Sequence, residues 1–313
     1  MPLSAPVILA FAVLYFSWST TYAAIKIGVE HFPPLLFGGV RIALAGFVLL
    51  AILRLQGQSL AVSRPVARNL LLIGTLFFLT GNGLLIIAER TVDSGLTAVL
   101  ISPTPLLLAL IELLLPGGDR LTVRGWVGLL LGLSGAVALA APRVGSWVQL
   151  QGDPGVLLLV FSSLSWAVGA ALARHGAMPK SPFVAAGYQM LLGGLGSTLV
   201  GLCLGEGAQV RLSAAELPGV YAFLYLLVFG SLLGFVAYVY LLAHVSAALA
   251  STYSYVNPAL ALVVGAVFLG ETITLPTVLA MVVILAGVAL LKLGGVRPKL
   301  HAEPINTAAP ADR

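Results

Sequence analysis

Residues 33–53 read PPLLFGGVRIALAGFVLLAIL: two prolines followed by nineteen almost entirely apolar residues, with Arg41 near their middle. Nineteen residues are about the number that an α-helix needs to cross the hydrocarbon core of a membrane. An isolated arginine at the centre of such a helix costs roughly 2.5–3.5 kcal/mol on insertion scales. Either the stretch is not a membrane helix, or Arg41 has a specific reason to be there.

The composition of the whole chain indicates a membrane protein. Of the 313 residues, 59% are hydrophobic and 9% are charged, with a mean hydropathy of +1.06. A soluble domain carries about 25% charged residues, so lipid must be the main solvent of this chain. The net charge of +5 comes without a lysine-rich face and does not indicate nucleic acid. The single Cys203 excludes an internal disulfide or a thiolate metal cluster. Residues 1–10 lack the basic start of a cleavable signal.

Ten apolar stretches have the length of a membrane helix, and the stretches between them carry charge, proline or glycine. The predicted spans are 6–25, 35–53, 69–88, 94–115, 124–141, 155–173, 183–204, 218–242, 247–269 and 275–293. Strands of a β-barrel would be about ten residues long and would alternate in hydrophobicity, which these stretches do not. We therefore predict an all-α membrane protein with ten transmembrane helices.

The loop charges predict the orientation. With the N-terminus inside, the cytoplasmic segments hold Arg54, Arg64, Arg68, Arg120, Arg124, Arg174, Lys180, Lys292, Arg297, Lys299 and Arg313. The outer segments hold Lys26, Arg90, Arg143 and Arg211. Because positive residues concentrate on the cytoplasmic side, both termini are predicted to be cytoplasmic, with residues 294–313 as a disordered tail.

The second half of the chain resembles the first. SWSTTYAAIK (17–26) aligns with SWAVGAALAR (165–174), and LSGAVAL (133–139) aligns with LAGVALL (285–291), at offsets of 148 and 152 residues. The same alignment pairs Trp18 with Trp166, Pro34 with Pro182, Arg41 with Gln189, and Pro105 with Pro258. Residues 1–145 and 152–293 are thus predicted to be two copies of five spans each. Five is odd, so the second copy enters the membrane inverted, as in many secondary transporters.

These motifs resemble the EamA-type family, the ten-helix branch of the drug/metabolite transporter superfamily. The resemblance rests on WSTTYAAIK in the first span, an arginine in the second, a mid-helix proline followed by GD or GE, and the closing L-x-G-x-A-L helix. It covers residues 5–293 and implies metabolite transport, commonly export of amino acids or related compounds across a bacterial inner membrane. It also implies that helices one to four and six to nine enclose the cavity.

Two charged residues lie inside predicted spans, and each has two interpretations. Arg41 is predicted roughly 9 Å below the outer end of its helix. It either binds a substrate carboxylate in a central cavity, or it extends outward to the interface or pairs with Glu30, Glu89 or Asp93. Glu112, as a buried carboxylate, either couples transport to protons or binds a cationic substrate, or it is an interfacial acid. As an interfacial acid it would pair with Arg120 or Arg124.

Aromatic and hydroxyl side chains near mid-depth predict the lining of a cavity. Trp18 and Trp166 lie eleven to thirteen residues into their spans, beside serines and threonines that would gain nothing from facing lipid. Such a lining suits an amphipathic small molecule, although serine and threonine also join helices. The predicted substrate-binding residues are Trp18, Thr20, Tyr22, Arg41, Asn82, Ser102, Trp166, Tyr188, Gln189, Tyr238, Tyr255 and Asn257.

Pro103, Pro105 and Pro258 are predicted to break helices four and nine at equivalent points. Each proline frees the carbonyl four residues earlier, and interruptions at matching places in both halves point to a transporter site. The alternative is a packing kink without ligand contact. By contrast, the glycines in GWVGLLLGLSG (125–135) and AGVAL (286–290) are predicted to allow close helix packing, away from the site.

The chain has no HExxH, GxSxG or GxxxxGK[ST] motif, so the sequence does not indicate an enzyme, a metal, a cofactor or ATP drive. We predict a secondary-active inner-membrane exporter of amino acids or similar amphipathic metabolites, working by alternating access. Uptake or exchange of another organic anion or a nucleotide-linked solute, multidrug efflux, and a membrane enzyme or scaffold are the alternatives. The partners are a small-molecule substrate and the bilayer, without nucleic acid; monomer and homodimer both stay open.

Overall fold

The computed structural model describes residues 4–115, 120–145, 153–211, 213–245, 252–293 and 296–297. In these residues, nine helical segments are long and apolar enough to cross a membrane, and a tenth, Tyr253–Leu269, is apolar but shorter. The prediction of an all-α membrane protein with ten helices is therefore confirmed. The ninth predicted span, 247–269, begins among residues outside the described part of the chain.

Six of the ten spans are single helices, and the ninth is described from residue 253. These helices are α1 (Ala5–His31), α2 (Pro34–Leu55), α7 (Val123–Gly145), α8 (Pro154–His175), α9 (Pro182–Cys203), α13 (Tyr253–Leu269) and α14 (Leu275–Lys292). Most begin with a proline in the first turn, where its missing N–H leaves no hydrogen bond unmade. At the start of α8, the Asp153 side chain also accepts a hydrogen bond from the Gly155 amide at 2.8 Å.

The third, fourth and eighth spans are interrupted. Their segments are α3 (Arg64–Gly74), η1 (Thr75–Asn82) and α4 (Gly83–Ala88); α5 (Ser94–Ile101) and α6 (Thr104–Leu114); and α10 (Leu217–Tyr225), η5 (Leu226–Leu233) and α11 (Gly234–His244). Both η1 and η5 are π-helices of eight residues. Because a π-turn disrupts the regular hydrogen-bond ladder, it frequently marks a functional site.

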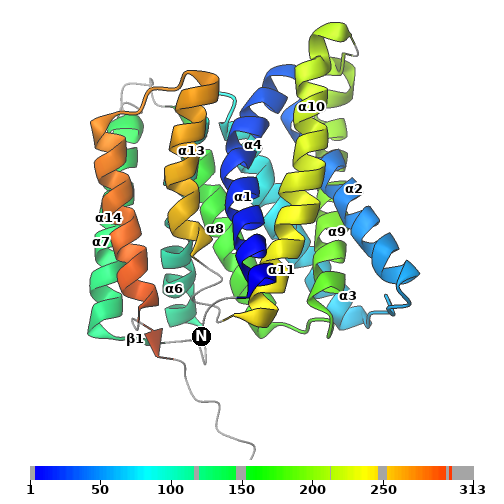
Figure 1. The fold of residues 1–313 in the computed structure, drawn as a ribbon, viewed down its shortest axis with the longest axis horizontal. Helices are drawn as coiled ribbons and strands as arrows, with labels where there is room; N and C mark the ends of the chain where they lie inside the picture. Colours follow the sequence, from blue (N-terminus) through cyan, green and yellow to red (C-terminus); the bar gives the residue numbers. More distant parts are fainter. Residues whose placement is uncertain are drawn as a thin grey trace, which may run out of the picture.

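Figure 1 shows the helices side by side, with α7 and α14 at one edge and α2, α3 and α9 at the other. The helix α1 starts at the lower end, where the N-terminus lies, and ends at the upper end with His31. We call these the N-terminal end and the far end. The loops between α1 and α2 and between α4 and α5 therefore lie at the far end.

Glycines bring two helix pairs into backbone contact. A Cβ atom on Gly194 of α9 would lie 2.3 Å from the backbone nitrogen of Ala43 on α2. On the other side of the molecule, a Cβ on Gly287 of α14 would lie 2.4 Å from the backbone nitrogen of Gly132 on α7. Neither position has room for a side chain. The prediction that the glycines of residues 125–135 and 286–290 serve close packing is confirmed.

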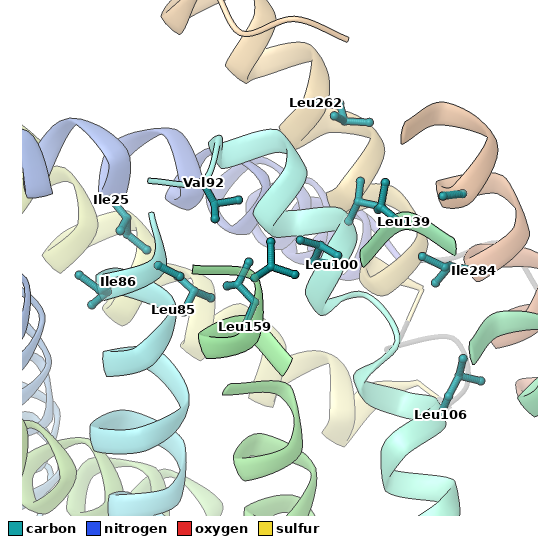
Figure 2. Packing of buried hydrophobic residues seen from close by; sticks show 14 of the residues in the cluster. Ile25, Leu85, Ile86, Val92, Leu100, Leu106, Leu139, Leu159, Leu262 and Ile284 are labelled. Atoms are coloured by element: carbon teal, nitrogen blue, oxygen red, sulfur yellow. The ribbon is translucent and has the colours of Figure 1, made fainter. Parts of the chain in front are cut away.

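The largest buried apolar cluster lies between α1, α4, α5, α8, α13 and α14. Figure 2 shows its leucine, isoleucine and valine side chains, among them Ile25, Val92 and Ile284, filling the space between these helices. Many other large apolar side chains, such as Phe47 and Phe268, are exposed. An apolar outer surface of this kind is what a lipid-facing helix bundle requires.

Three details differ from the sequence-based expectations. Lys26 and Lys292, which were counted as loop charges, lie in the last two turns of α1 and in the last turn of α14. In the predicted disordered tail, Val296 and Arg297 form strand β2 (Val296–Arg297), antiparallel to β1 (Arg120–Leu121). The rest of residues 294–313 lies outside the described part of the chain.

Glu271 provides a testable contact between the two halves of the chain. Its carboxylate accepts hydrogen bonds from the amides of Ser94, at 2.7 Å, and Gly95, at 2.9 Å, at the start of α5. We expect Glu271→Ala to lower the stability of the purified protein by about 2 kcal/mol, because the cap and two charge-assisted bonds are lost. Thermal unfolding in detergent measures this, with the exposed Glu30→Ala as control; an equal Tm for both variants would contradict the assignment.

Candidate functional site

Arg41 lies inside the bundle. It is the eighth residue of α2, about 10 Å from the start of the helix at Pro34, and its side chain is 4% exposed. Its Nη1 donates a hydrogen bond to Ser231 Oγ at 3.2 Å, and its Nη2 donates one to Asn82 Oδ1 at 3.4 Å. Ser231 belongs to η5 and Asn82 ends η1, so both π-helices contact the guanidinium group.

Both hydrogen-bond partners of Arg41 are uncharged, and neither bond is short. None of the ion pairs among the described residues includes Arg41, and its buried Nε has no hydrogen-bond partner there. The predicted alternative, in which Arg41 pairs with Glu30, Glu89 or Asp93, is therefore wrong. A buried cation normally has an anionic partner, because removing its hydration is unfavourable. A negatively charged group bound there would supply the charged partner that the described side chains do not.

Aromatic rings lie beside the guanidinium site. Trp18 Nε1 donates a hydrogen bond to the carbonyl oxygen of Gly230 at 3.3 Å, next in the chain to Ser231. The Trp18 ring contacts the rings of Tyr238 and Tyr253, with centroids 5.3 Å and 4.9 Å away, and these two tyrosines also contact each other. The three rings come from α1, α11 and α13 and form an apolar surface near the cation.

Polar contacts join α1 to the helices of the second half. Ser19 Oγ donates to Asn257 Oδ1 at 3.2 Å, in a pair that is buried on both sides. Thr20 Oγ1 and the hydroxyl of Tyr225 are 2.6 Å apart. Thr20 and Asn257, both predicted as site residues, thus hold α1 against α10 and α13 in this structure.

Several predicted site residues make other contacts. Tyr188 donates to the carbonyl oxygen of Leu60 at 2.9 Å, in the loop after α2 at the N-terminal end. Trp166 stacks on Phe77 of η1 at 4.6 Å and is 36% exposed. Gln189 is buried at the eighth position of α9, the place that Arg41 has in α2. The structure therefore does not bring Tyr188 or Trp166 into contact with Arg41.

Two further predicted site residues, Tyr22 and Tyr255, lie apart from the guanidinium group of Arg41. Tyr22 packs, half-buried, against the large apolar cluster of α1, α4 and α5. Tyr255, on α13, has the ammonium group of Lys292 5.0 Å from its ring centroid. The same ammonium donates to Ser254 Oγ at 2.8 Å. Neither tyrosine is among the described contacts of the guanidinium group.

The proline positions differ between the two halves. The fourth span leaves the helix at Ser102 and Pro103 and resumes at Thr104, with Pro105 in the first turn of α6. The carbonyl oxygens of Val99 and Ile101 accept hydrogen bonds from the hydroxyls of Ser102 (2.7 Å) and Thr104 (2.5 Å). They are therefore satisfied without a ligand.

Helix α13 has no matching interruption in its described residues. It continues from Tyr253 through Pro258 to Leu269. The predicted break at Pro258 is therefore wrong: the proline lies inside α13, and the chain is helical on both sides of it, as membrane helices tolerate. Equivalent breaks in the two halves occur instead at η1 and η5, whose starts are 151 residues apart.

Glu112 has partners that the sequence did not suggest. Its buried carboxylate lies 2.9 Å and 3.1 Å from Nε2 of His175, and 3.5 Å from Nη1 of Arg174, at the C-terminal end of α8. The predicted partners were Arg120 and Arg124, which are nearer in sequence. With two basic neighbours, Glu112 joins α6 to α8 at the N-terminal end, which favours its interpretation as an interfacial ion pair over a proton carrier.

Sequence reasoning missed Ser231, Gly230 and Tyr225, which contact the predicted residues Arg41, Trp18 and Thr20. All three belong to the eighth span, a mainly apolar stretch. One available signal was the alignment of the two halves. Shifted by the 151 residues that separate the starts of η1 and η5, Ser231 aligns with Thr80, so both halves have a hydroxyl residue at this position. The π-helical geometry that presents these groups leaves no simple mark in the sequence.

Comparison with known proteins agrees with this architecture. The model of the EamA-like transporter family matches the chain twice, over residues 5–141 and 153–293. The chain belongs to this family. It is therefore a multi-pass membrane protein of a transporter family, and Arg41 lies in the second helix of this EamA-like chain.

Relatives cover nearly the full length of this EamA-like chain. The uncharacterized inner membrane transporter YedA of Escherichia coli K12 is 38% identical over 292 residues, 92% of this chain and 91% of YedA. The uncharacterized transporter YvbV of Bacillus subtilis is 26% identical over 305 residues, 96% of both chains. A solved crystal structure, 23% identical in sequence, superposes with a TM-score of 0.63 and covers 94% of this chain and 98% of that one, which shows the same fold.

Proposed function

We propose that the protein is a secondary-active exporter of small amphipathic metabolites that carry a carboxylate, amino acids first among them, across a bacterial inner membrane. The observation that carries the proposal is the buried guanidinium of Arg41, which contacts only uncharged groups in the described structure. A carboxylate would make charge-assisted hydrogen bonds to it that no described side chain supplies.

The other contacts fit the rest of such a solute. The rings of Trp18, Tyr238 and Tyr253 offer an apolar surface for a hydrophobic side chain. Asn82 Oδ1 is a hydrogen-bond acceptor beside the cation, where an ammonium or hydroxyl group of the solute could donate. The name of YedA, an inner membrane transporter, supports the bacterial inner membrane as the location.

The two π-helices support alternating access. Residues of both η1 and η5 contact Arg41. An anion that binds Arg41 would therefore change the contacts of two helices whose backbone hydrogen bonding is already irregular. Two inverted halves with equivalent flexible segments would open the site to each side in turn. The N-terminal end of the bundle would face the cytoplasm and the far end the outside, as the loop charges predict.

Two measurements test this function. Purified protein is reconstituted into vesicles of phosphatidylethanolamine and phosphatidylglycerol that are loaded with unlabelled L-phenylalanine, L-leucine or L-threonine. The labelled amino acid is then added outside. We expect counterflow well above that of protein-free vesicles for at least one of the three. Equal rates with and without protein for all three would contradict the proposal.

The direction of transport is tested in cells. Cells that overproduce the protein are loaded with the dipeptide of the transported amino acid, which internal peptidases cleave. We expect the free amino acid to appear in the medium faster than from cells that carry Arg41→Gln at the same expression level. Faster accumulation inside the cells would show uptake and contradict export.

A further inference from the structure

The far end of the bundle holds a group of buried oxygen atoms that have no partner. In the described part of the chain, both carboxylate oxygens of Glu89, the hydroxyl of Ser94 and the hydroxyl of Thr97 are buried without a hydrogen bond. Glu89 is 0% exposed and follows directly after α4, just outside the apolar span. Buried polar atoms are nearly always bonded, so this cluster calls for an explanation.

Lys26 indicates the charge state of Glu89. Its ammonium group donates to the backbone carbonyl oxygens of Glu89, at 2.7 Å, and Val92, at 3.2 Å. It makes no ion pair within 4.0 Å of the Glu89 carboxylate, although it contacts the backbone of the same residue. A buried, ionised carboxylate would attract this ammonium more strongly than a carbonyl does. The geometry therefore fits a neutral, protonated carboxyl group.

The surroundings favour the same state. Lys26 and Tyr22 face Glu89 from α1, and Glu271 faces it from the connection between α13 and α14. At the start of α8, Asp153 is engaged by the hydroxyl of Thr91 at 2.8 Å. Burial raises the pKa of the Glu89 carboxyl well above its usual value, Glu271 raises it further, and Lys26 opposes both.

The Glu89 cluster is connected to the Arg41 site through two helices. Asn82, which contacts Arg41, and Glu89 flank α4 at its two ends, seven residues and about 10 Å apart, a spacing that places them on one face. On α1, Trp18 and Lys26 are eight residues apart, on one face with Tyr22 between them. Ile25, Ile86 and Val92, which are near these residues in the sequence, belong to the apolar cluster of Figure 2.

We propose that Glu89 is the proton-binding carboxylate of the transport cycle, with Lys26 as the counter-ion that it gains when the proton leaves. In the arrangement seen here, Glu89 is buried and carries its proton. The proton is taken from external water when the far end opens. When the N-terminal end opens instead, water from the cytoplasm reaches the carboxyl group, its O–H bond breaks, and the proton passes to that water. The carboxylate that remains then pairs with the ammonium of Lys26.

This inference rests on the proposed function and adds its driving ion, since a proton gradient would supply the energy for export. Glu112, the acid considered from the sequence, is a poorer candidate because His175 and Arg174 already hold its carboxylate. Glu206 is also buried at the far end, but its oxygens accept from the amides of Leu35 and Leu36. Glu89 is the described buried acid whose oxygens lack partners.

The test separates exchange from proton-driven transport. Wild-type protein and Glu89→Gln are reconstituted in the vesicles described above. Counterflow of L-phenylalanine is measured at equal pH on both sides, and accumulation is measured under a pH gradient. We expect both proteins to show counterflow and only the wild type to accumulate label. Glu206→Gln is the matched control and should accumulate label like the wild type.

Three outcomes would overturn the proposal. One is accumulation by Glu89→Gln equal to that of the wild type. A second is a wild type that shows counterflow but does not respond to the pH gradient. A third is accumulation driven by a sodium gradient alone, which would make the cluster a metal-cation site.

A measurement without substrate keeps the inference testable if the proposed function fails, that is, if no counterflow occurs. Infrared difference spectra between wild type and Glu89→Gln in detergent at neutral pH should show the carbonyl band of a protonated carboxylic acid. Absence of this band would overturn the proposal. Removing the nearby positive charge by Lys26→Gln should move the loss of the band to higher pH, because Lys26 stabilises the ionised form. A shift to lower pH, or none, would contradict the role of Lys26.

Discussion

Arg41→Gln is expected to weaken the apparent affinity for a transported amino acid by about 100-fold. The charge-assisted contact between a buried guanidinium and a substrate carboxylate is worth about 3 kcal/mol, and each 1.4 kcal/mol corresponds to about tenfold in affinity. Glutamine keeps a polar amide inside the bundle, but it is shorter than the arginine that contacts Ser231 and Asn82, and it carries no charge to match the carboxylate. The concentration dependence of L-phenylalanine counterflow in vesicles measures the change.

Stability separates a binding role of Arg41 from a structural one. The native protein buries this cation among neutral partners, so its removal should leave the Tm in detergent unchanged or higher. Arg54→Gln, at the exposed C-terminal end of the same helix, is the matched control and should leave affinity unchanged. A lower Tm together with normal affinity for Arg41→Gln would show that the arginine only stabilises the fold.

Gly194→Ala is expected to have the largest effect on stability. The added Cβ would lie 2.3 Å from the backbone nitrogen of Ala43 and 2.8 Å from the carbonyl oxygen of Gly39, and neither atom can rotate away. The helices α2 and α9 must therefore separate, at about 2 kcal/mol or more. We expect the Tm of the purified protein to fall by about 5 °C.

The control for this prediction lies two residues away. A Cβ on Gly196 would have its nearest neighbour, Leu79 Cδ2, at 3.8 Å, which is ordinary contact. Gly196→Ala should therefore leave the Tm unchanged or slightly higher, since alanine favours a helix more than glycine does. Equal loss of stability in both variants would mean that glycine is needed for reasons other than the contact between α2 and α9.

The number and positions of the helices could be predicted from the sequence because each span is a continuous apolar stretch of membrane length. Thus α2 was expected at 35–53 and lies at Pro34–Leu55, and α9 was expected at 183–204 and lies at Pro182–Cys203. The interruptions were harder to predict. Proline indicated the break at Pro103, but the π-helices η1 and η5 depend on tertiary packing and carry no comparable residue.

The candidate site could be predicted only in part. Arg41, Trp18 and Asn82 stood out because polar groups in an apolar helix are unfavourable without a role. Ser231 was missed because serine is common in membrane helices, and its contact with Arg41 spans 190 residues of sequence. Glu89 was considered only as a partner for Arg41, since its burial beside Lys26 depends on how the loop between α4 and α5 folds.

The central claim is that the buried cation of Arg41 binds the carboxylate of the transported solute. The most direct measurement compares L-phenylalanine with L-phenylalaninamide as competitors of labelled L-phenylalanine counterflow in vesicles. The two compounds share the aromatic side chain and the amino group and differ in the carboxylate. We expect the acid to compete at concentrations about 100-fold lower than the amide with the wild type, and this preference to vanish with Arg41→Gln. Equal competition by acid and amide in the wild type would contradict the account.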